Sequence, residues 1–446
     1  MGYVIMIAQF LLSLSILIIL HEMGHFLPAK FFRTRVEKFY LFFDPWFSLF
    51  RKKIGETEYG IGWLPLGGYV KISGMIDESM DKEQMKKPAQ PWEFRSKPSW
   101  QRLIIMLGGV TVNFLLGFLL YGMVLFVWGS EYLPASEVKY GYYMDSLARD
   151  MGLQHGDKIL KVGDSEFERY DVGAFRKEIV INDAKTVTVD RDGHITQIPV
   201  DEKFVRLLSS YEYKDVWLFE PRVPCVIKEI QKGTPASESG LQPGDRLLRI
   251  NDVETPYFDQ FYHEIRQHKS EPVQLLVDRD GRENSVSLTT TEQGTIGFAA
   301  QTFLDVFKTQ REEYSLLRAI PAGFVEGSDF LISQLKAFGK MFRGKIKASE
   351  SLGGFGTISG LFPKFWSWEA FWRVTAILSL ILAFMNLLPI PALDGGHVMF
   401  LMYEVITGRK PSDKFMEYAT YVGFILIIAL ILYANGLDFF RWWDGR

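Results

Sequence analysis

The sequence predicts a multi-pass α-helical membrane protein with about four spans, a membrane-dipping β-hairpin and two α+β domains. Three observations lead to this fold class: long apolar segments toward both ends, a soluble middle that contains an internal repeat, and a short apolar stretch rich in Gly and Pro. The 446 residues are 48% hydrophobic and have a mean hydropathy of +0.03, which fits a mixture of apolar and soluble segments.

Overall charge and cysteine content exclude several function classes. The formal net charge is −3 and the pI is about 6.2, so we expect no nucleic-acid partner. Cys225 is the single cysteine. It excludes an intramolecular disulfide and a zinc site built from cysteines.

The first apolar run, from Tyr3 to Leu20, is long enough to cross most of a bilayer. It leads without a turn signal into the motif His21-Glu-Met-Gly-His25, so we expect one helix that continues until Pro28 stops it. The alternative is a removed signal peptide. A retained span is favoured, because the run lacks a basic stretch before it and a small-residue cleavage site after it.

The basic residues after this span indicate its orientation. Lysine and arginine outnumber acidic residues between positions 30 and 53, and cytoplasmic loops carry such an excess. We therefore expect the N-terminus outside and this segment on the cytoplasmic side of the membrane.

Residues 56–73 are predicted to form short strands around Pro65 and the Gly67-Gly68 pair, since Pro and paired Gly suit turns and sheet edges. This piece is too apolar for a free loop, so we expect a hairpin that dips into the membrane beside the motif. Residues 75–98 are interpreted as a cytoplasmic linker with a surface-lying piece around Trp92 and Phe94.

A second span is predicted from Leu103 to Trp128, which completes a first membrane region over residues 1–129. It contains Gly108-Gly109 and Asn113. Asn is costly in a span unless something pairs with it, and Gly lets another helix approach closely. Helix packing and a role near the site both remain open for Asn113.

The soluble region from residue 130 to residue 305 contains a duplicated unit. The pattern Gly152-Leu-Gln-His-Gly-Asp157 recurs 88 residues later as Gly240-Leu-Gln-Pro-Gly-Asp245. The pattern small-x-x-x-Gly-Leu-x-x-Gly-Asp resembles that of PDZ domains in the permuted form of bacterial envelope proteases, which bind extended peptides by strand addition. We expect two PDZ-like domains, over 130–205 and 206–305. A packing module that binds nothing is the alternative.

Residues 306–365 are predicted to hold an amphipathic surface helix after Pro321, followed by a Gly-rich loop. The lysines and arginines of this helix conflict with the predicted topology, which places the helix on the outer side of the membrane. The loop lacks the Gly-Lys-Ser/Thr ending of a phosphate-binding loop, so nucleotide binding is not expected.

The last membrane region, 366–446, has predicted spans at Phe371–Leu388 and Ala419–Tyr433. Between them, Pro and Gly break the helix at membrane depth, which is tolerated where backbone is buried in protein or lines a wet cavity. Asp394 lies in this break and is a functional candidate by default.

The motif at the end of the first span predicts a zinc site. Histidines four apart lie on one helix face and can bind one metal ion, with the intervening Glu22 as general base on the metal-bound water. Catalytic zinc usually has three protein ligands. His21 and His25 supply two, and we choose Asp394, at the same membrane level, as the third. His397 is the other candidate for the third ligand. We interpret it as a packing residue or as a residue that contacts the ligands without binding the metal.

His263-Glu-Ile-Arg-Gln-His268 resembles the zinc motif, but its histidines are five residues apart. This spacing leaves the two rings about 140° apart around a helix. We interpret this segment, and the turn residues His155 and His194, as ordinary surface.

These motifs together resemble those of the site-2 protease family, the intramembrane zinc metalloproteases. The family pattern of His-Glu-x-x-His in one span and Asn-x-x-Pro-x-Pro-x-Leu-Asp-Gly in a later one is matched at His21–His25 and at Asn386–Gly395. Gly109-Val-Thr-Val-Asn113 matches a further family element, and the likeness extends over nearly the whole chain.

The resemblance implies a zinc-dependent endopeptidase of the bacterial inner membrane that cleaves single-span membrane proteins. These include anti-sigma factors that a first protease has already cut, and leftover signal peptides. It further implies that the PDZ pair is periplasmic and excludes intact substrates, that the active site lies near the cytoplasmic side, and that residues 56–73 hold the substrate as an added strand. We expect a monomer in contact with the lipid bilayer. The expected substrate-binding residues are Asn113, Asn386, Gly67, Gly68, Tyr69, Pro389 and Pro391.

Two other function classes fit parts of the sequence. A membrane metal-binding or transport protein would place polar residues along several spans, whereas here they cluster at one depth. An inactive PDZ scaffold would not require Glu22 or Asp394. Both alternatives are therefore weaker than a protease.

Overall fold

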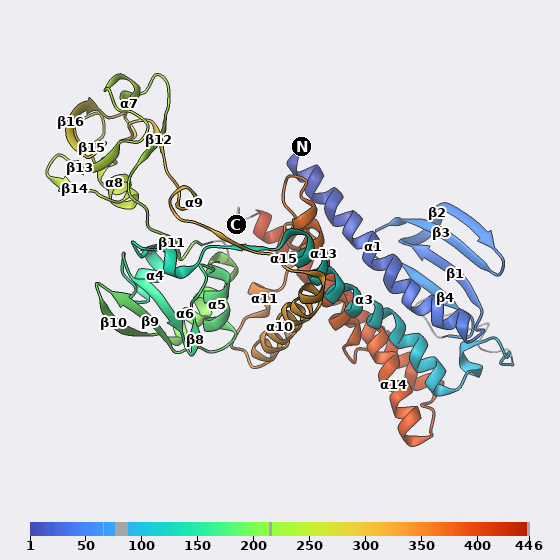
Figure 1. Cartoon of the computed structure of the whole chain (residues 1–446). Helices are drawn as coiled ribbons and strands as arrows, with labels where there is room; N and C mark the ends of the chain where they lie inside the picture. Colours follow the sequence, from blue (N-terminus) through green and yellow to red (C-terminus); the bar gives the residue numbers. More distant parts are fainter. Residues whose placement is uncertain (66, 76–87, 214–215, 444–446) are drawn as a thin grey trace. The chain divides into compact units, whose positions relative to one another are not determined.

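The computed structural model describes residues 1–65, 67–75, 88–213 and 216–443 (Figure 1). These residues form two compact units. The first contains residues 1–129, 313–342 and 351–446, and the second contains residues 130–312 and 343–350. Residues 76–87 of the predicted linker lie outside the described residues. Of its surface-lying piece, Phe94 is buried and Trp92 is exposed.

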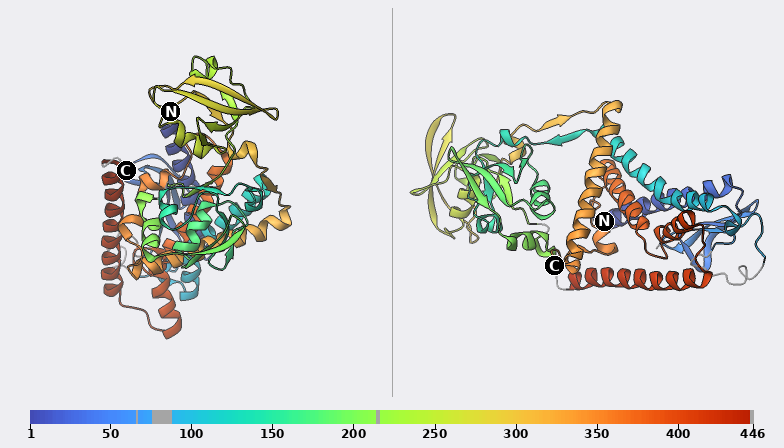
Figure 2. Two further views of the ribbon diagram at one scale, coloured as in Figure 1. Left: turned by 90° about the vertical axis from the view of Figure 1, so that its left-hand side faces the viewer. Right: turned by 90° about the horizontal axis from the view of Figure 1, so that it is seen from below.

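Four helices of the first unit are long and apolar enough to cross a membrane, in agreement with the predicted number of spans. They are α1 (Gly2–Phe31), α3 (Ser99–Trp128), α13 (Trp368–Leu387) and α15 (Asp413–Trp443). The last helix extends well beyond the predicted span of 419–433 in both directions and is continuous in Figure 2.

The prediction that Pro28 stops the first helix is wrong. α1 continues to Phe31, and the backbone N–H of Phe32 donates to the carbonyl of Pro28 at 2.9 Å. A proline removes one donor and crowds the carbonyl four residues earlier. Here that carbonyl belongs to Gly24, in the last two turns of the helix, so the helix keeps its direction at the cost of one hydrogen bond.

Glycines bring the helices of this unit into close contact. α1 and α3 meet where Gly24 faces Gly108, and an added Cβ on either residue would collide with the other residue's backbone. On α10 (Leu316–Phe342), an added Cβ at Gly323 would collide with the backbone of Gly122 of α3. Small residues permit this approach in membrane helices.

α10 differs from the predicted surface helix. It begins five residues before Pro321, and its buried residues include Ala319, Gly323 and Gly327, which face α3. The predicted apolar face is only partly covered, since Phe338 contacts Phe384 of α13 while Phe342 is 89% exposed. The helix therefore packs against two spans through small residues that the apolar pattern did not single out.

The predicted hairpin at 56–73 is also wrong. The strands β1 (Val36–Leu41), β2 (Phe43–Ile54), β3 (Thr57–Leu64) and β4 (Tyr69–Ile72) form one sheet in the order β2-β3-β1-β4. β3 and β4 do not pair with each other, because β1 lies between them, parallel to β3 and antiparallel to β4. The tight hairpin joins β2 to β3. β4 is thus an edge strand, and the sheet lies beside α1 (Figure 1).

The chain breaks between α13 and α14 (Asp394–Thr407), as the Pro and Gly pattern predicts. Added Cβ atoms at Gly395 and Gly396 would meet the backbone of residues 387–391, so the chain folds tightly back on itself here.

Preceding α13, the Gly-rich segment forms α12 (Phe355–Ser359). The backbone N–H and the hydroxyl of Thr357 in this helix both donate to Asp438 of α15.

The second unit contains the same fold twice. Its two four-stranded sheets have the same strand order, β10-β9-β7-β8 in the first repeat and β16-β15-β13-β14 in the second. Each repeat has its own apolar core. The elements of the first repeat are β6 (Tyr142–Met144), α4 (Ser146–Asp150), β7 (Lys158–Val162), β8 (Ser165–Glu166), α5 (Val172–Val180), β9 (Thr186–Arg191), β10 (His194–Pro199), α6 (Glu202–Ser209) and β11 (Phe219–Pro221). Those of the second are β12 (Ile227–Ile230), α7 (Pro235–Glu238), β13 (Arg246–Ile250), β14 (Val253–Glu254), α8 (Phe258–Ile265), β15 (Pro272–Arg279), β16 (Arg282–Thr289) and β17 (Phe298–Ala300).

The boundary between the repeats lies later than predicted. β11 pairs with β6 and Phe219 belongs to the first core, so the first repeat continues to Pro221 instead of ending at residue 205. Short elements flank the repeats: β5 (Ser130–Tyr132), α9 (Phe303–Val306), β18 (Gln310–Glu312) and α11 (Ala348–Ser351).

An arginine–aspartate pair recurs at the same place in both repeats. Arg191 donates to Asp157 at 2.7 and 2.8 Å and to the carbonyl of Gly152 at 3.0 Å. Arg279 makes the same three contacts with Asp245 and Gly240. Both aspartate side chains are buried, and two parallel N–H donors hold such a carboxylate in one geometry. This explains the recurrence of the Gly-Asp turn in the sequence.

We expect Arg191→Met to destabilise the first repeat by roughly 3 kcal/mol, because it leaves the buried Asp157 carboxylate without its cation. The matched control is Lys161→Met, which breaks the exposed pair with Glu166 and should cost less than about 1 kcal/mol. Urea unfolding of the full chain in detergent, followed by proteolysis within residues 130–312, measures both. Equal effects of the two variants would contradict this account.

Candidate active site

His21, His25 and Asp394 bring three ligand atoms to one point. Nε2 of His21 lies 3.2 Å and Nε2 of His25 lies 3.3 Å from Oδ2 of Asp394. The two Nε2 atoms are 3.4 Å apart. Both histidines are buried. Among the described residues, these three form the one group of His, Cys, Asp or Glu ligands close enough to share a metal ion.

The spacing fits a zinc ion. Tetrahedral zinc with bonds of about 2.0–2.1 Å has ligand atoms about 3.3–3.4 Å from one another, and the three separations lie close to this value. Oδ2 of Asp394 is buried, and among the described residues no group donates a hydrogen bond to it. A carboxylate oxygen in that situation needs a cation. The three residues therefore have the chemistry and the separations of a catalytic zinc set with one coordination position left over.

Backbone contacts fix the orientation of His25. Its Nδ1 lies 2.8 Å from the carbonyl oxygen of Ile105 on α3. A carbonyl only accepts, so Nδ1 carries the proton and the lone pair of Nε2 points at the site. A metal-binding histidine normally has such a partner on its other nitrogen.

Two asparagines contact His21. Nδ2 of Asn113 lies 3.2 Å from Nδ1, and Nδ2 of Asn386 lies 3.3 Å from Nε2. When Nε2 binds a metal, Nδ1 carries the proton, so Asn113 has to present its amide oxygen to it. Asn113 is fully buried on α3 and acts on the ring, whereas Asn386 reaches the metal-binding side of His21.

Gly109 lies directly under the two imidazoles. An added Cβ there would collide with Nε2 of His25 and would lie 2.7 Å from Cε1 and 2.9 Å from Nδ1 of His21. The close contact between α1 and α3 thus gives the rings their space, and the Gly109-x-x-x-Asn113 element places its two ends against the two histidines.

Glu22 lines a cavity of about 640 Å³ together with the three ligands. β4 (Tyr69–Ile72) forms one wall of this cavity. Gly68 precedes β4, and an added Cβ there would lie 2.5 Å from Ile18 Cγ2 and 2.7 Å from the Tyr40 carbonyl oxygen. Glycine at this position therefore lets the edge strand lie against α1 beside Glu22.

Comparison with known proteins decides the family. The sequence model described as Peptidase family M50 matches residues 9–430. The chain belongs to this family. It is 27% identical to the regulator of sigma-E protease RseP of Escherichia coli K12 over 472 residues, covering 98% of each chain. The regulator of sigma E protease of Haemophilus influenzae is 24% identical over 465 residues, covering 99% of this chain and 100% of the relative. A protein of Treponema pallidum that carries the name of a zinc metalloprotease is 27% identical over 455 residues, covering 96% and 97%.

Family membership settles the broad function. The chain is a zinc metalloprotease of the site-2 type, and its four apolar helices make it an integral membrane protein. It acts in regulated intramembrane proteolysis, as the resemblance in the sequence implies. The transport and inactive-scaffold alternatives are therefore set aside.

The other predicted residues of this M50 peptidase differ in whether they line the cavity. Gly68 and Tyr69 line the cavity. Gly67 lies against the Phe43 ring. Pro389 and Pro391 shape the chain before Asp394, and the Pro391 carbonyl packs against Gly423 of α15. His397 lines the cavity but is not part of the ligand group.

Several cavity residues of the peptidase were not found from the sequence. They lie on β1, β2, α3 and α15, whose contributions come from pairing and packing between distant segments. The run at 36–43, with Val36 and four aromatic residues, is a usable strand signal. The missed residues are Lys38, Phe43, Asp44, Pro45, Met106, Thr420 and Phe424.

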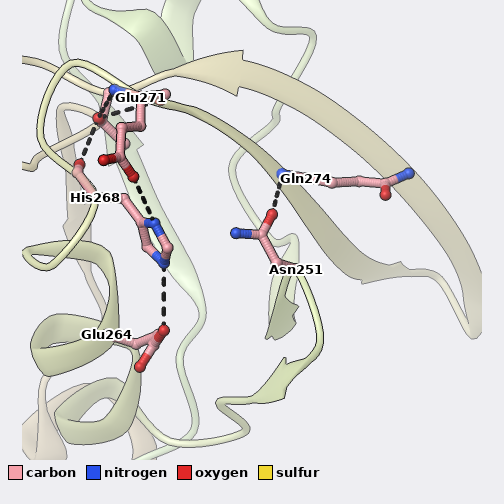
Figure 3. Close-up of polar contacts among 6 residues, drawn as sticks. Asn251, Glu264, His268, Glu271 and Gln274 are labelled. Carbon is pink, nitrogen blue, oxygen red and sulfur yellow. Dashed lines mark hydrogen bonds and ion pairs between the residues drawn. The ribbon is translucent and has the colours of Figure 1, made fainter.

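The second histidine motif holds no metal group among the described residues. His268 contacts Glu271 at 3.0 Å and Glu264 at 3.3 Å, and Figure 3 shows its ring between the two carboxylates, beside the Asn251–Gln274 hydrogen bond. Hydrogen bonding, first with Glu271 and then with Glu264, raises the pKa of His268. His263 turns instead to the hydroxyl of Tyr143, at 2.9 Å.

We expect Gly109→Ala to weaken zinc binding of the peptidase by at least about tenfold, because the methyl group displaces both ligand rings. The control is Gly436→Ala, in another spanning helix, where an added Cβ meets nothing within 4 Å. Zinc per chain, measured after dialysis against a weak chelator, reports the effect. Full zinc occupancy in Gly109→Ala would contradict the close fit of α1 to α3.

Proposed function

We propose that this peptidase cleaves single-span membrane proteins within or near the bilayer, with His21, His25 and Asp394 as zinc ligands and Glu22 as general base. The observation that carries the proposal is the convergence of the three ligand atoms beside a cavity that Glu22 lines. Substrates of the anti-sigma-factor type fit the names of the sigma-E protease relatives, and leftover signal peptides are a second expected class.

A zinc ion held by these residues would act as a Lewis acid. It would polarise the scissile carbonyl and make the attacking water easier to deprotonate. Glu22 takes the proton from the attacking water on its carboxylate and delivers it to the leaving amine. Glu22 lines the same cavity as Val70 of the edge strand, where an added substrate strand would lie. Asn386, whose Nδ2 lies beside the metal-binding nitrogen of His21, is placed to donate to the developing oxyanion.

The edge strand β4 supports substrate binding by strand addition. A helical substrate hides its scissile amide in hydrogen bonds and has to unwind before it reacts. An unwound segment pairing with β4 regains backbone partners at a depth where an unpaired polar group costs several kcal/mol. β4 has β1 on one side and the cavity on the other, so an added strand would pass the ligand group.

The orientation and the role of the repeats extend this proposal. The basic residues between α1 and α3 favour a cytoplasmic side for the site, with the N-terminus and the two repeats in the periplasm of a bacterial inner membrane. The duplicated fold supports the PDZ-like interpretation, in which the repeats exclude substrates whose outer domain is intact. We propose that the peptidase acts as a monomer.

We expect Glu22→Gln to keep wild-type zinc content while cleavage of a co-expressed single-span substrate falls by at least about 100-fold, because the general base is lost and the ligands remain. Substrate fragments are followed by immunoblot, and zinc is measured in the same purified sample. Continued cleavage by Glu22→Gln would defeat the assignment of Glu22, whereas loss of zinc would point to a structural role.

A further inference from the structure

Asp44 places an unpaired negative charge in the cavity wall, away from the zinc ligands. Its Oδ1 accepts from the hydroxyl of Tyr69 at 2.9 Å and its Oδ2 accepts from the hydroxyl of Ser48 at 3.0 Å. Within residues 1–65, 67–75, 88–213 and 216–443, no cation forms an ion pair with it. Two hydroxyl donors leave further lone pairs and the whole charge available to a ligand.

The backbone around Asp44 is held in a strained conformation. Phe42 and Trp46 both have positive φ, 68° and 73°, which bulky residues rarely adopt. The pairing of β2 with β3 shifts register between Phe43 and Ser48, and the Trp63 indole donates to the Pro45 carbonyl at 2.9 Å. Such strain persists where surrounding contacts enforce it, and it clusters at functional sites.

Two lysines, Lys38 and Lys71, line the same cavity as Asp44, but each has a different partner. Lys71 pairs with Glu37 at 3.6 Å, and the Lys38 ammonium lies over the Tyr40 ring, 5.3 Å from its centroid. Burial, together with the Asp44 hydrogen bond and charge, raises the pKa of the Tyr69 phenol well above its usual range. Tyr69 therefore stays protonated and donates to Asp44.

We propose that Asp44 is a specificity-determining residue that selects a lysine or arginine side chain of the substrate close to the scissile bond. Gly68 and Tyr69 are consecutive at the start of β4: an added Cβ on Gly68 would lie 3.6 Å from Cγ of Glu22, and the Tyr69 hydroxyl donates to Asp44. On a strand added to β4, the side chain opposite Tyr69 points to the same sheet face as Tyr69. Asp44 would therefore contact the side chain of a substrate residue within about two positions of the residue beside Glu22. This inference rests on the proposed strand addition at β4.

The test uses the full zinc-loaded chain in liposomes and single-span peptides that differ only by Lys, Gln or Glu at successive positions around the cleaved bond. Mass spectrometry locates the bond, and kcat/KM is compared between peptides. At one position the wild-type enzyme should cleave the Lys peptide about tenfold faster than the Glu peptide. In Asp44→Asn, which keeps the side-chain shape, this ratio should fall to near one.

Glu58→Gln is the matched control. Glu58 accepts from the Tyr40 hydroxyl at 2.7 Å on the same sheet, but it does not line the cavity. This variant should keep the wild-type Lys-to-Glu ratio. An unchanged ratio in Asp44→Asn, an equal loss in Glu58→Gln, or no Lys preference in the wild type would each overturn the role of Asp44. Failure of the zinc-loaded wild type to cleave every peptide would overturn the proposed function itself, and this proposal with it.

Discussion

The site depends on two helices that touch backbone to backbone. His21 and His25 extend from α1 toward α3, and the space for their rings exists because Gly24, Gly108 and Gly109 have no side chains. α3 then supplies the Ile105 carbonyl and the Asn113 amide that orient the two imidazoles. Lipid offers no hydrophobic force that would bring helices together, so this packing and its hydrogen bonds determine the geometry of the ligands.

The third candidate ligand, Asp394, lies at a break in the membrane helices. A helix that continued past Leu387 would carry its backbone hydrogen bonds through the membrane, but it would not turn Asp394 back toward α1. The Pro- and Gly-rich segment makes that turn. Gly395 and Gly396 allow the chain to fold onto residues 387–391. Irregular backbone of this kind is stable at membrane depth where protein or a wet cavity surrounds it, and here it borders the cavity that contains Glu22.

The candidate site residues could be predicted from the sequence because they belong to local motifs. The histidine spacing, the Asn386–Gly395 pattern and Gly109-x-x-x-Asn113 each identify residues within one or two turns, and the spans follow from apolar length alone. The sheet is different. β1 lies between β3 and β4. The pattern of residues 56–73 does not indicate that a strand from residues 36–41 pairs between its two strands. The α10 contact likewise depends on Gly323 meeting Gly122, a pairing of surfaces that α10 alone does not indicate. Asp44 was missed for the same reason, since its place in the cavity depends on a bulge and on Tyr69 of another strand.

The central claim is that His21, His25 and Asp394 bind one zinc ion together. X-ray absorption at the zinc edge, on the purified full chain and on Asp394→Ala, tests it most directly. The account predicts one zinc per wild-type chain with two imidazoles and oxygen ligands at about 2.0–2.1 Å, and strongly reduced zinc in Asp394→Ala. Stoichiometric zinc with an unchanged spectrum in Asp394→Ala would contradict it.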